Sequence, residues 1–527
     1  MEQVKGNVAM TDARQKTEEF EKLRKIYEQG GGRKAIDKVH SQGKLTARER
    51  IEKLVDPGSF REFNLWAKPT KTGFKSDEKD AYGDAVVTGF CRVDGRPVCL
   101  YAHDFTVMGG TQASVQYWKS CKAMDTAIRL GIPYIGIVDS GGVRIQDAFG
   151  INAGSGVSRN ADVWYTPAVA SGIVPSISLT LGASYAGTAY SPFLADVFFM
   201  VDKPYCYMSL ASPELLKSVT SKEVTRDEIG AAKLHAQVTG SCDYLGETEE
   251  DVLRKGRELL SYLPSNCRDK PPRVDTGDDP MRTDDALVDL ISHDAPDFYD
   301  MHEVIKRIVD GGNFFELKSR YAGNIIVGFG RLGGRSVGIV ANNPMVLGGA
   351  LDFRAAEKEA RFIRYCDAFN VPLVFLVDTP GYLADPEQER EGLARHAAMA
   401  SYALCEATVP KIVIHVGRCF GNGQMSMGTR LMGADAVLAW PTADIRCADF
   451  GELARAIYGS DMKDMHQSDI EEFSRKYLDS PKVPASLLMV DDILNPKNTR
   501  PALIDMLVAA ENKTVTFPKK KHGNMPL

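Results

Sequence analysis

Six clusters of glycine and other small residues are the parts of this 527-residue chain most suited to chemistry. Each follows an apolar run, so a strand is expected to lead into small residues at the start of a helix. Such a turn presents unpaired backbone N–H groups beside the positive helix end, and these donors can stabilise an oxyanion. The clusters are Val107-Met-Gly109-Gly110-Thr111, Asp139-Ser-Gly141-Gly142-Val-Arg144, Gly182-Ala-Ser-Tyr185-Ala186-Gly187-Thr188-Ala189, Val346-Leu-Gly348-Gly349-Ala350, Asp378-Thr-Pro-Gly381-Tyr382 and Gly417-Arg-Cys-Phe-Gly421-Asn422-Gly423-Gln424. We therefore expect chemistry based on backbone hydrogen bonds to a substrate held close to the main chain.

The side-chain patterns of other enzyme classes are absent from the sequence or misplaced in it. No phosphate-binding G-x-x-x-x-G-K-[ST] loop and no H-E-x-x-H zinc motif occurs. The one G-x-S-x-G match, 334–338, falls in a predicted hairpin and not on the strand-to-helix elbow that a serine nucleophile needs. His40 and His396 stand alone, and a lone histidine usually has a structural role. We therefore expect neither a nucleophilic side chain nor a metal.

The clusters recur because the chain repeats itself. The phrase Gly131-Ile-Pro133-Tyr-Ile-Gly-Ile-Val-Asp139 reads like Asn370-Val-Pro372-Leu-Val-Phe-Leu-Val-Asp378, and the two prolines lie 239 positions apart. A second phrase, 173–182, is answered by 408–417. A period this long indicates a duplicated domain and not a solenoid, whose repeats have about 20–50 residues. Two related half-sites are the expected consequence for function.

Length and composition agree with two globular domains. A chain of 527 residues is too long for one hydrophobic core, and its 44% apolar and 25% charged residues are ordinary values. The segment 263–280 is rich in proline and charge, and it lacks an apolar period, as a linker does. We expect a first domain over residues 1–270 and a second over residues 271–527.

Charge, hydropathy and cysteine usage narrow the class of protein. A net charge of −6 gives no basic footprint for nucleic acid. No run approaches 18 apolar residues and the amino-terminus is polar, so we expect neither a membrane span nor a signal peptide. The ten cysteines form no C-x-x-C pair and mostly have apolar neighbours, which is typical of thiols in a reducing compartment. The expectation is a soluble cytoplasmic protein.

Helices and strands are predicted to alternate in both halves. Residues 12–55 have helical character, with a capping box formed by Thr46 and Glu49. Asp94-Gly95 is a hairpin signal. The further predicted elements are helix 116–129, strands 132–138 and 174–181, helix 301–310, a hairpin through 332–334, strand 336–341, helix 354–368, strand 372–377, helix 391–406 and strand 411–416. This rhythm indicates an α/β layered architecture in each half.

Short motifs distributed over nearly the whole chain resemble one family. They are His40-Ser-Gln-Gly-Lys-Leu-Thr-Ala-Arg-Glu-Arg-Ile, Asp56-Pro-Gly-Ser-Phe60, Asp104-Phe-Thr-Val, Asp139-Ser-Gly-Gly-Val-Arg-Ile-Gln146, Lys217-Ser-Val-Thr220, Asn324-Ile-Ile-Val-Gly-Phe, Asp367-Ala-Phe-Asn-Val-Pro, Arg395-His396 and Trp440-Pro-Thr-Ala443. The combination resembles the carboxyltransferase (β) subunit of biotin-dependent acyl-CoA carboxylases, of the propionyl-CoA carboxylase β and methylmalonyl-CoA decarboxylase α type. The resemblance implies two tandem crotonase-like (ClpP/crotonase superfamily) β-β-α spiral domains in a homo-hexamer.

The resemblance also implies a mechanism and its residues. CO₂ would move between carboxybiotin and the α-carbon of an acyl-CoA thioester, through an enolate held by backbone N–H groups. The first domain would bind the coenzyme A thioester and the second domain the biotin arm. By motif match, the thioester hole falls on Ala186 and Gly187, and the biotin hole on Asn422 and Gly423. The expected substrate-binding positions around them are Gly109, Gly110, Gly141, Gly142, Arg144, Tyr185, Gly381 and Tyr382.

Partners and alternatives follow from what the sequence lacks or changes. There is no Ala-Met-Lys-Met biotinylation site and no ATP-grasp module, so a biotin carboxyl carrier protein and a biotin carboxylase subunit are expected as partner chains. The acidic Asp449 and Glu452 stand where the family has small residues, and we expect Asp449 to be solvated or paired with a cation such as Arg446. These changes leave a biotin-independent decarboxylase of a malonyl-CoA-type substrate as the alternative. A non-catalytic scaffold is disfavoured by the intact first-half glycines.

Overall fold

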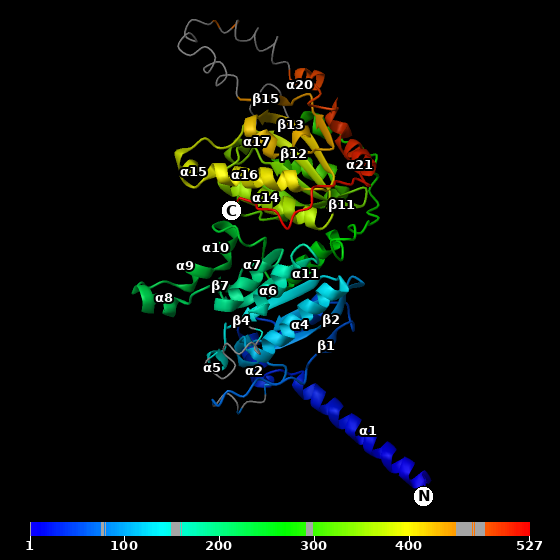
Figure 1. Cartoon of the computed structure of the whole chain (residues 1–527), viewed down its shortest axis with the longest axis vertical. Helices are drawn as coiled ribbons and strands as arrows, with labels where there is room; N and C mark the ends of the chain where they lie inside the picture. The colour runs from blue at the N-terminus through cyan, green and yellow to red at the C-terminus, as the bar shows by residue number, and fades with distance from the viewer. Residues whose placement is uncertain are drawn as a thin grey trace. The chain divides into compact units, whose positions relative to one another are not determined.

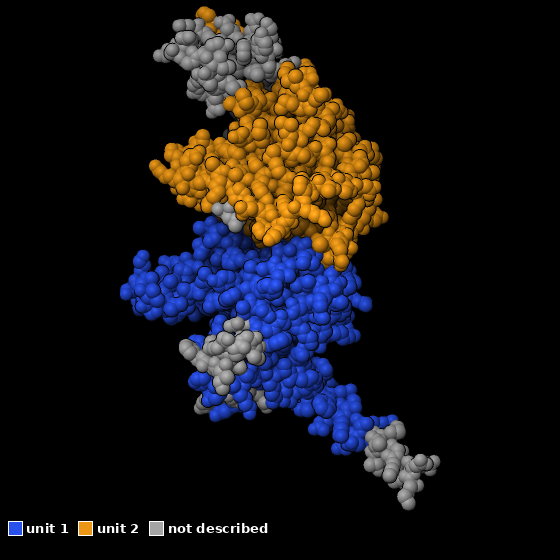
Figure 2. All heavy atoms as spheres, viewed as in Figure 1, with its two compact units in different colours: residues 1–261 blue, residues 262–527 orange. Residues whose placement is uncertain are grey.

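The computed structural model describes residues 2–74, 78, 81–148, 159, 161–290, 299–448, 466, 468 and 480–526. The chain divides into two compact units, Met1–Ser261 (unit 1) and Tyr262–Leu527 (unit 2), coloured separately in Figure 2. The boundary expected after residue 270 lies nine residues beyond this division (270 against 261). Each unit has its own sheet and its own buried core, as expected of a duplicated domain.

The amino-terminal region of unit 1 forms three helices, α1 (Glu2–Tyr27), α2 (Arg33–Ser41) and α3 (Ala47–Leu54). The predicted helical stretch therefore breaks twice, first at Gly30 and Gly32, which both have positive φ. The predicted capping box at the start of α3 is confirmed, because the Glu49 N–H donates to Thr46 Oγ1 and the Thr46 N–H donates to the Glu49 carboxylate. The breaks let α2 and α3 fold back as separate short helices.

Unit 1 is built on an eight-stranded sheet in the order β1-β2-β3-β4-β5-β6-β8, with β7 paired to the end of β5 (Figure 1). The strands are β1 Arg61–Phe63, β2 Val86–Val93, β3 Arg96–His103, β4 Tyr134–Ser140, β5 Ser176–Tyr185, β6 Val197–Val201, β7 Tyr207–Ser209 and β8 Tyr244–Gly246. The hairpin predicted at Asp94-Gly95 is confirmed by the antiparallel pairing of β2 and β3. From β3 to β6 the strands run parallel, so their carboxyl ends meet at one edge of the sheet.

Two helices pack over one face of this sheet, α4 (Ser114–Leu130) and α6 (Asp162–Ala170). Tyr117 and Met124 of α4 share a core with Val163 of α6 and with Cys99 and Tyr134 of the strands. The remaining helices of unit 1 are α5 Ile145–Ala148, α7 Tyr190–Leu194, α8 Pro213–Thr220, α9 Arg226–Gly230, α10 Ala232–Gln237 and α11 Glu249–Tyr262. α4 confirms the helix predicted over 116–129.

Unit 2 repeats this plan with the sheet order β16-β14-β13-β12-β11-β10-β9, and β15 pairs with the end of β13. Its strands are β9 Phe315–Leu317, β10 Ile325–Leu332, β11 Arg335–Asn342, β12 Leu373–Thr379, β13 Lys411–Phe420, β14 Ala436–Ala439, β15 Asp444–Arg446 and β16 Asp492–Ile493. β10 and β11 form the second predicted hairpin, and β11, β12, β13 and β14 run parallel. The two sheets thus share hairpin, parallel strands and strand order.

Helices cover both faces of the second sheet. α14 (Phe353–Ala368) packs on one face, where Phe362 contacts Phe329 of β10, and α16 (Leu393–Glu406) lies against α14. On the other face, Ile305 of α13 (Met301–Ile308) and Leu503 of α21 (Thr499–Ala509) pack against strand residues such as Val374. The short helices are α12 Ala286–Asp289, α15 Pro386–Arg390, α17 Gly421–Ser426 and α20 Lys482–Ser486. Within the described part of the chain, no helix is long and apolar enough to cross a membrane.

Candidate functional site

The three first-half clusters come together at the carboxyl ends of β3, β4 and β5. The Gly141 N–H donates to the Gly109 carbonyl over 3.0 Å, which joins the turn after β3 to the turn after β4. A Cβ on Gly110 would lie 2.3 Å from the Asp139 carbonyl oxygen, and one on Gly182 would lie 2.0 Å from the Asp139 carboxylate. Glycine is therefore required at both positions because the backbone or the carboxylate fills the space of a side chain.

The third cluster forms a turn from strand into helix. β5 ends at Tyr185, and the 3-10 helix Ala186–Ala189 begins directly after it with Ala186 at φ 50°. No side chain caps this helix start, and the first N–H groups of a helix have no acceptor inside it. The turn after β4 lies alongside, since a Cβ on Gly142 would come within 3.3 Å of the Tyr185 carbonyl oxygen. The N–H groups of Ala186 and Gly187 are thus placed at the edge where the strands end.

Two cavities of unit 1 adjoin these turns. The α2 cavity, of about 610 Å³, is lined by Ala35, Lys38, Val39, Gln42, Phe105, Thr106, Met108, Gly109, Thr111, Val143, Arg144, Ile145 and Gln146. The α6 cavity, of about 410 Å³, is lined by Gln112, Tyr117, Val143, Ala161, Val163, Trp164, Ala186, Gly187, Tyr190 and Leu210. Val143 lines both cavities, so the two are adjacent: the α2 cavity has polar and charged residues in its wall, and the α6 cavity is mainly apolar.

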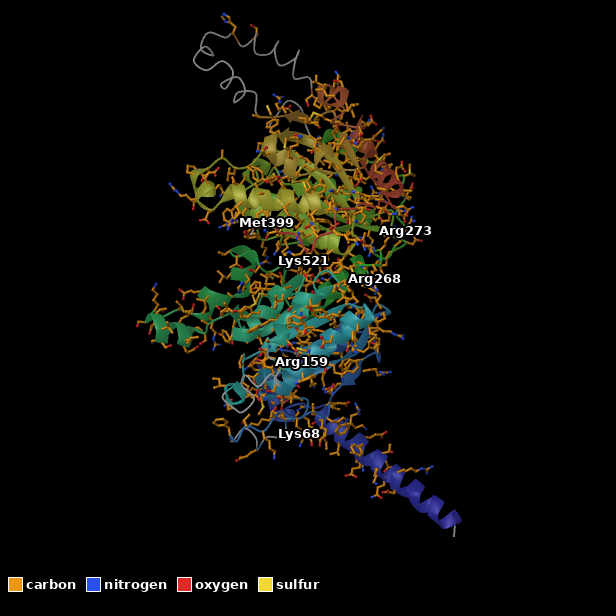
Figure 3. The ribbon with its side chains drawn as sticks, in the orientation of Figure 1. Lys68, Arg159, Arg268, Arg273, Met399 and Lys521 are labelled. Atoms are coloured by element: carbon orange, nitrogen blue, oxygen red, sulfur yellow. The ribbon has the colours of Figure 1, made fainter. Side chains whose placement is uncertain are left out.

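The aromatic wall of the α6 cavity was not predicted from the sequence. The Trp164 indole N–H lies 3.4 Å from the Gly187 carbonyl oxygen, and the Trp164 and Tyr190 rings are 5.0 Å apart. Arg159, labelled in Figure 3, fixes α6 to α4 because its guanidinium pairs with Asp125 of α4 and with Asp162 of α6. A single sequence offered no signal that would have placed Trp164 at this turn.

Arg144 and Tyr185, predicted to bind substrate, have partners inside unit 1. The Arg144 guanidinium is buried, forms an ion pair of 2.8 Å with Asp84, and donates to the Thr111 carbonyl. The Tyr185 ring packs against Tyr207 with 4.6 Å between centroids, and burial raises the pKa of Tyr185, so its phenol stays neutral. Both residues hold the turns in place, and Arg144 in addition lines the α2 cavity.

A buried charge network lies beneath the unit 1 turns. The Asp139 carboxylate pairs with Lys44 at 2.6 Å and with Arg50 at 2.9 Å, and Arg50 also pairs with Glu249. Burial lowers the pKa of Lys44, while Asp139 acts in the opposite direction. α3 and the loop before it thus supply the two cations that neutralise the carboxylate at the end of β4.

The unit 2 clusters meet in the same way at the ends of β11, β12 and β13. A Cβ on Gly349 would lie 2.4 Å from the Asp378 carbonyl oxygen, and one on Gly417 would lie 2.4 Å from the Asp378 carboxylate. That carboxylate accepts hydrogen bonds from Arg418 at 2.8 Å and from the Tyr299 hydroxyl at 2.9 Å. The skeleton of glycines around a terminal aspartate is therefore duplicated.

The second strand-to-helix turn leads from β13 into α17. Gly421 has φ 51°, as Ala186 has 50°, and the helix start at Phe420 has no side-chain cap. A Cβ on Gly423 would lie 2.6 Å from the Gly381 Cα, so the predicted residues of two clusters touch here. The Tyr382 hydroxyl lies 2.6 Å from Ser426 Oγ. All four predicted unit 2 residues, Gly381, Tyr382, Asn422 and Gly423, gather at this turn.

The internal register of the duplication differs by one position from the predicted donor pairs. The strands end at Tyr185 and Phe420, and the matching positive φ angles pair Ala186 with Gly421. Gly187 therefore corresponds to Asn422. The pairs Ala186 with Gly187 and Asn422 with Gly423 remain predictions, and they are not strict counterparts of each other.

Two further predictions concern residues near the second turn. Asp449 and Glu452, the acidic residues expected beside it, lie outside the described residues. Arg446, the cation suggested as a partner, pairs with Asp444 at 2.5 Å. Among the residues that the structure describes, no group of three or more His, Cys, Asp or Glu side chains could hold a metal ion.

Comparison with known proteins identifies the family. Residues 38–525 match the family described as carboxyl transferase domain. Over 509 residues the chain is 42% identical to the methylmalonyl-CoA decarboxylase subunit alpha of Veillonella parvula, covering 96% of this chain and 98% of that relative. It is 41% identical over 503 residues to the propionyl-CoA carboxylase carboxyltransferase subunit of Haloferax mediterranei, covering 94% of this chain and 96% of the relative.

A solved structure agrees with the sequence relatives. The transcarboxylase 12S crystal structure, a hexamer assembly with methylmalonyl-coenzyme A and methylmalonic acid bound, matches with a TM-score of 0.93 and 38% identity. The match covers 98% of this chain and 99% of that one. The predicted fold, two tandem crotonase-like α/β domains, is thereby confirmed. The chain belongs to the carboxyl transferase domain family, the carboxyltransferases of biotin-dependent acyl-CoA carboxylases, as its motifs predicted.

Proposed function

We propose that this chain moves CO₂ between carboxybiotin and the α-carbon of an acyl-CoA, with one strand-end turn for each reactant. The observation that carries the proposal is the duplication itself: each unit has an uncapped helix start at the carboxyl ends of parallel strands. Backbone donors fixed at the place where negative charge develops supply much of the stabilisation in such reactions. The reaction requires two such places, because the thioester oxygen and the ureido oxygen both gain charge.

Unit 1 is proposed to hold the acyl-CoA. The N–H groups of Ala186 and Gly187 would bind the thioester oxygen and stabilise the enolate that forms there. The α2 cavity, with Lys38 in its wall, offers a cationic surface to the phosphates of coenzyme A, and the α6 cavity receives the acyl group. Gly109, Gly110, Gly141 and Gly142 keep the turns small enough for the thioester to approach the main chain.

Unit 2 is proposed to hold the ureido group of biotin. The N–H groups of Asn422 and Gly423 have no acceptor within α17, and Gly381 leaves room beside them, since the atom nearest to a Cβ there is 3.8 Å away. These residues fit a small planar group that accepts hydrogen bonds. Carboxybiotin, when bound, would supply the CO₂ and accept the α-proton. The chain's own part is to orient the ureido oxygen and to pack Tyr382 against Ser426 beneath it.

The partners follow from the same proposal. Biotin would arrive on a biotin carboxyl carrier protein that is charged by a biotin carboxylase subunit, and the chain would form a homo-hexamer like the transcarboxylase 12S assembly. All ten cysteines are free thiols in the structure, and a reducing, cytoplasmic location stays a proposal made from the sequence.

Biotin-independent decarboxylation is the second candidate, because unit 1 alone carries a turn for the enolate and both cavities. In that case the enolate would form when the carboxylate of a malonyl-type thioester leaves as CO₂, and the α-carbon would then take a proton from water. The relative from Veillonella parvula is named a methylmalonyl-CoA decarboxylase subunit. The two candidates differ in whether the turn of unit 2 matters for turnover.

The test compares two variants, using methylmalonyl-CoA with and without free biotin. Gly187→Val blocks the approach of the thioester and should lower both reactions by about 10²–10³. Asn422→Pro removes one N–H in the first turn of α17, and with the fold intact by circular dichroism it should lower only biotin-dependent transfer, again by about 10². Asn422→Ala keeps the N–H and is the matched control.

Each result decides between the candidates. Carboxyl transfer that is lost in both Gly187→Val and Asn422→Pro, but kept in Asn422→Ala, supports the first candidate. A rate of CO₂ release without biotin that is unchanged in Asn422→Pro supports the second candidate. Full activity in Gly187→Val, with an unchanged circular dichroism spectrum, would remove unit 1 from both.

A further inference from the structure

Gln112 is fixed by its backbone beside the turn after β4. Its N–H donates to the Gly142 carbonyl at 2.8 Å, and its carbonyl accepts from the Arg144 N–H at 2.8 Å. A short parallel bridge with Val143 results. The side chain is thereby directed into the wall of the α6 cavity, next to Gly187.

The side-chain carbonyl oxygen of Gln112 has no partner at this place. The residue is 2% exposed, and its Oε1 accepts no hydrogen bond within the described part of the chain. A Cβ on Gly187 would lie 3.1 Å from that oxygen, so the acceptor lies on the side of Gly187 that a side chain would occupy, next to the turn proposed to bind the thioester. The rest of the cavity wall is mainly apolar and includes Tyr117, Val163 and Leu210. A buried acceptor without a donor is costly, and it persists where a ligand supplies the donor.

The duplication shows that the fold does not need an amide here. Leu351 holds the corresponding place in unit 2, where its N–H donates to the Gly381 carbonyl at 2.9 Å and its carbonyl accepts from the Leu383 N–H at 2.8 Å. It forms the same parallel bridge, with Tyr382. Leu351 is fully buried, so a leucine makes this bridge without an unsatisfied polar atom.

We propose that Gln112 is a specificity-determining residue, and that the substrate's acyl group carries a hydroxyl that donates a hydrogen bond to Gln112 Oε1. The inference rests on the proposed function, since it places the thioester carbonyl at Gly187. A hydroxyl on the acyl chain close to the α-carbon would reach Gln112, while the remaining carbons contact Trp164 and Leu210. The substrate class is therefore a hydroxyacyl-CoA, in which the hydroxyl is a separate group from the carboxyl group that is transferred.

The experiment compares two acyl-CoA pairs in the full chain. The first pair is 3-hydroxybutyryl-CoA and butyryl-CoA, which differ in the hydroxyl. The second is methylmalonyl-CoA and propionyl-CoA, which differ in the α-carboxylate. For each compound, affinity is measured by calorimetry without biotin. The value of kcat/KM is measured with carboxybiotin as the CO₂ donor for the three compounds that lack an α-carboxylate, and with free biotin as the CO₂ acceptor for methylmalonyl-CoA. The variants are Gln112→Leu, which copies Leu351, and Leu210→Val, which trims the same cavity without changing its polarity.

The wild-type chain should prefer 3-hydroxybutyryl-CoA to butyryl-CoA by about tenfold or more, the size expected for one hydrogen bond to an otherwise unpaired acceptor. Gln112→Leu should abolish that preference, and Leu210→Val should change both members of the pair by the same factor. An equal response to the two compounds in the wild-type chain, or a preference that survives Gln112→Leu, overturns the inference. So does an effect of Gln112→Leu confined to the methylmalonyl-CoA and propionyl-CoA pair.

Failure of the proposed function would look different. In that case no acyl-CoA would exchange CO₂ with biotin, yet calorimetry would still rank the hydroxyacyl compound first and Gln112→Leu would still remove the ranking. Turnover with equal kcat/KM for both members of the first pair would instead leave the proposed function intact and remove the role of Gln112.

Discussion

In both units a buried aspartate closes the second parallel strand, Asp139 in unit 1 and Asp378 in unit 2. One glycine lies against the carbonyl group of this aspartate and another lies against its carboxylate. In unit 1 these are Gly110 and Gly182, and unit 2 has the same arrangement. The partners of the carboxylate differ. Asp139 pairs with two cations from before β1, whereas Asp378 pairs with Arg418 of the next strand and with Tyr299.

This difference distinguishes the features that the turn requires in both units from the features that differ between the units. A charged acceptor beneath two glycines is common to both halves, so it belongs to the geometry of the turn. The residues that neutralise or hydrogen-bond this carboxylate can vary, because any donor that reaches the carboxylate offsets the cost of burying it. Gln112 and Leu351 differ in the same way, because they form equivalent backbone bridges and only the polarity of the side chain has changed.

The largest expected effect comes from removing the shared carboxylate. Asp139→Asn leaves Lys44 and Arg50 buried with reduced compensation, and we expect unit 1 to lose about 3–5 kcal/mol of unfolding free energy. Asp378→Asn should cost unit 2 about 1–3 kcal/mol, because the Arg418 side chain is 36% exposed and water can solvate it. Hydrogen exchange of β4 and β12 amides measures each unit separately. Equal losses of unfolding free energy in the two variants would show that leaving buried cations without their carboxylate costs no more than leaving a partly exposed arginine without one.

Local patterns predicted much of this architecture. The two hairpins, α4, α14 and the strands that end in glycine turns all follow from short-range periodicity and turn chemistry. The sequence predicted the site at positions where other atoms approach the backbone so closely that only glycine fits, as at Gly110 and Gly182. Such signals lie within a few residues of each other in the sequence.

Contacts between distant segments could not be predicted. Arg50 meets Glu249 across 199 positions, and Gln112 meets Gly187 through the crossover between parallel strands. A single sequence carries no sign of these pairings, because each partner has an ordinary local pattern. The one-residue offset of the donor pairs has a different, local origin, since the motif match fixed residue types but not where the helix starts.

The second prediction exchanges the side chains of the paired bridge. Leu351→Gln would bury an amide in a fully enclosed position, and it should destabilise unit 2 by about 2–4 kcal/mol through lost packing and an unpaired polar group. Gln112→Leu should stabilise unit 1 by about 1 kcal/mol, because it removes an unsatisfied acceptor. Denaturant unfolding followed by hydrogen exchange in each unit measures both changes. A destabilising Gln112→Leu would mean that the amide has a structural partner, which contradicts the contrast with Leu351.

The third prediction uses a matched pair of buried lysines. Lys119 of α4 donates to two backbone carbonyls, and Lys358, at the corresponding position of α14, donates to four. Burial lowers the pKa of Lys119 to about 8 and that of Lys358 to about 7. Both values lie below the ordinary pKa of 10.5. Between the folded pKa of each lysine and pH 10.5, the unfolded chain therefore binds a proton that the folded chain does not. The stability of each unit should therefore rise with pH in its window.

The window opens near pH 7 for unit 2 and near pH 8 for unit 1, and in both it closes near pH 10.5. One proton limits the slope to about 1.4 kcal/mol per pH unit. Lys358→Met should flatten the profile of unit 2 and leave that of unit 1 unchanged, with Lys119→Met as the reciprocal control. Identical profiles in the wild-type chain and Lys358→Met would show that the lysine keeps its proton in the folded state.

The smallest effect concerns His302, at the start of α13 in unit 2. Its ring lies 3.1 Å from Glu316 and 2.6 Å from Asp300, and the hydrogen bond to Glu316 raises its pKa above 6.5. Because the folded pKa is raised, the stabilisation is complete below pH 6.5 and is lost as the pH rises through the folded value. The ring is partly exposed, so we expect a loss below about 1 kcal/mol. His302→Gln keeps a donor but does not titrate. Between pH 5.5 and 7, below the window of Lys358, the opening free energy of α13 and β9 measured by hydrogen exchange should therefore change less with pH in this variant than in the wild-type chain. If the wild-type chain and His302→Gln respond alike, the link between α13 and β9 does not depend on the charge of His302.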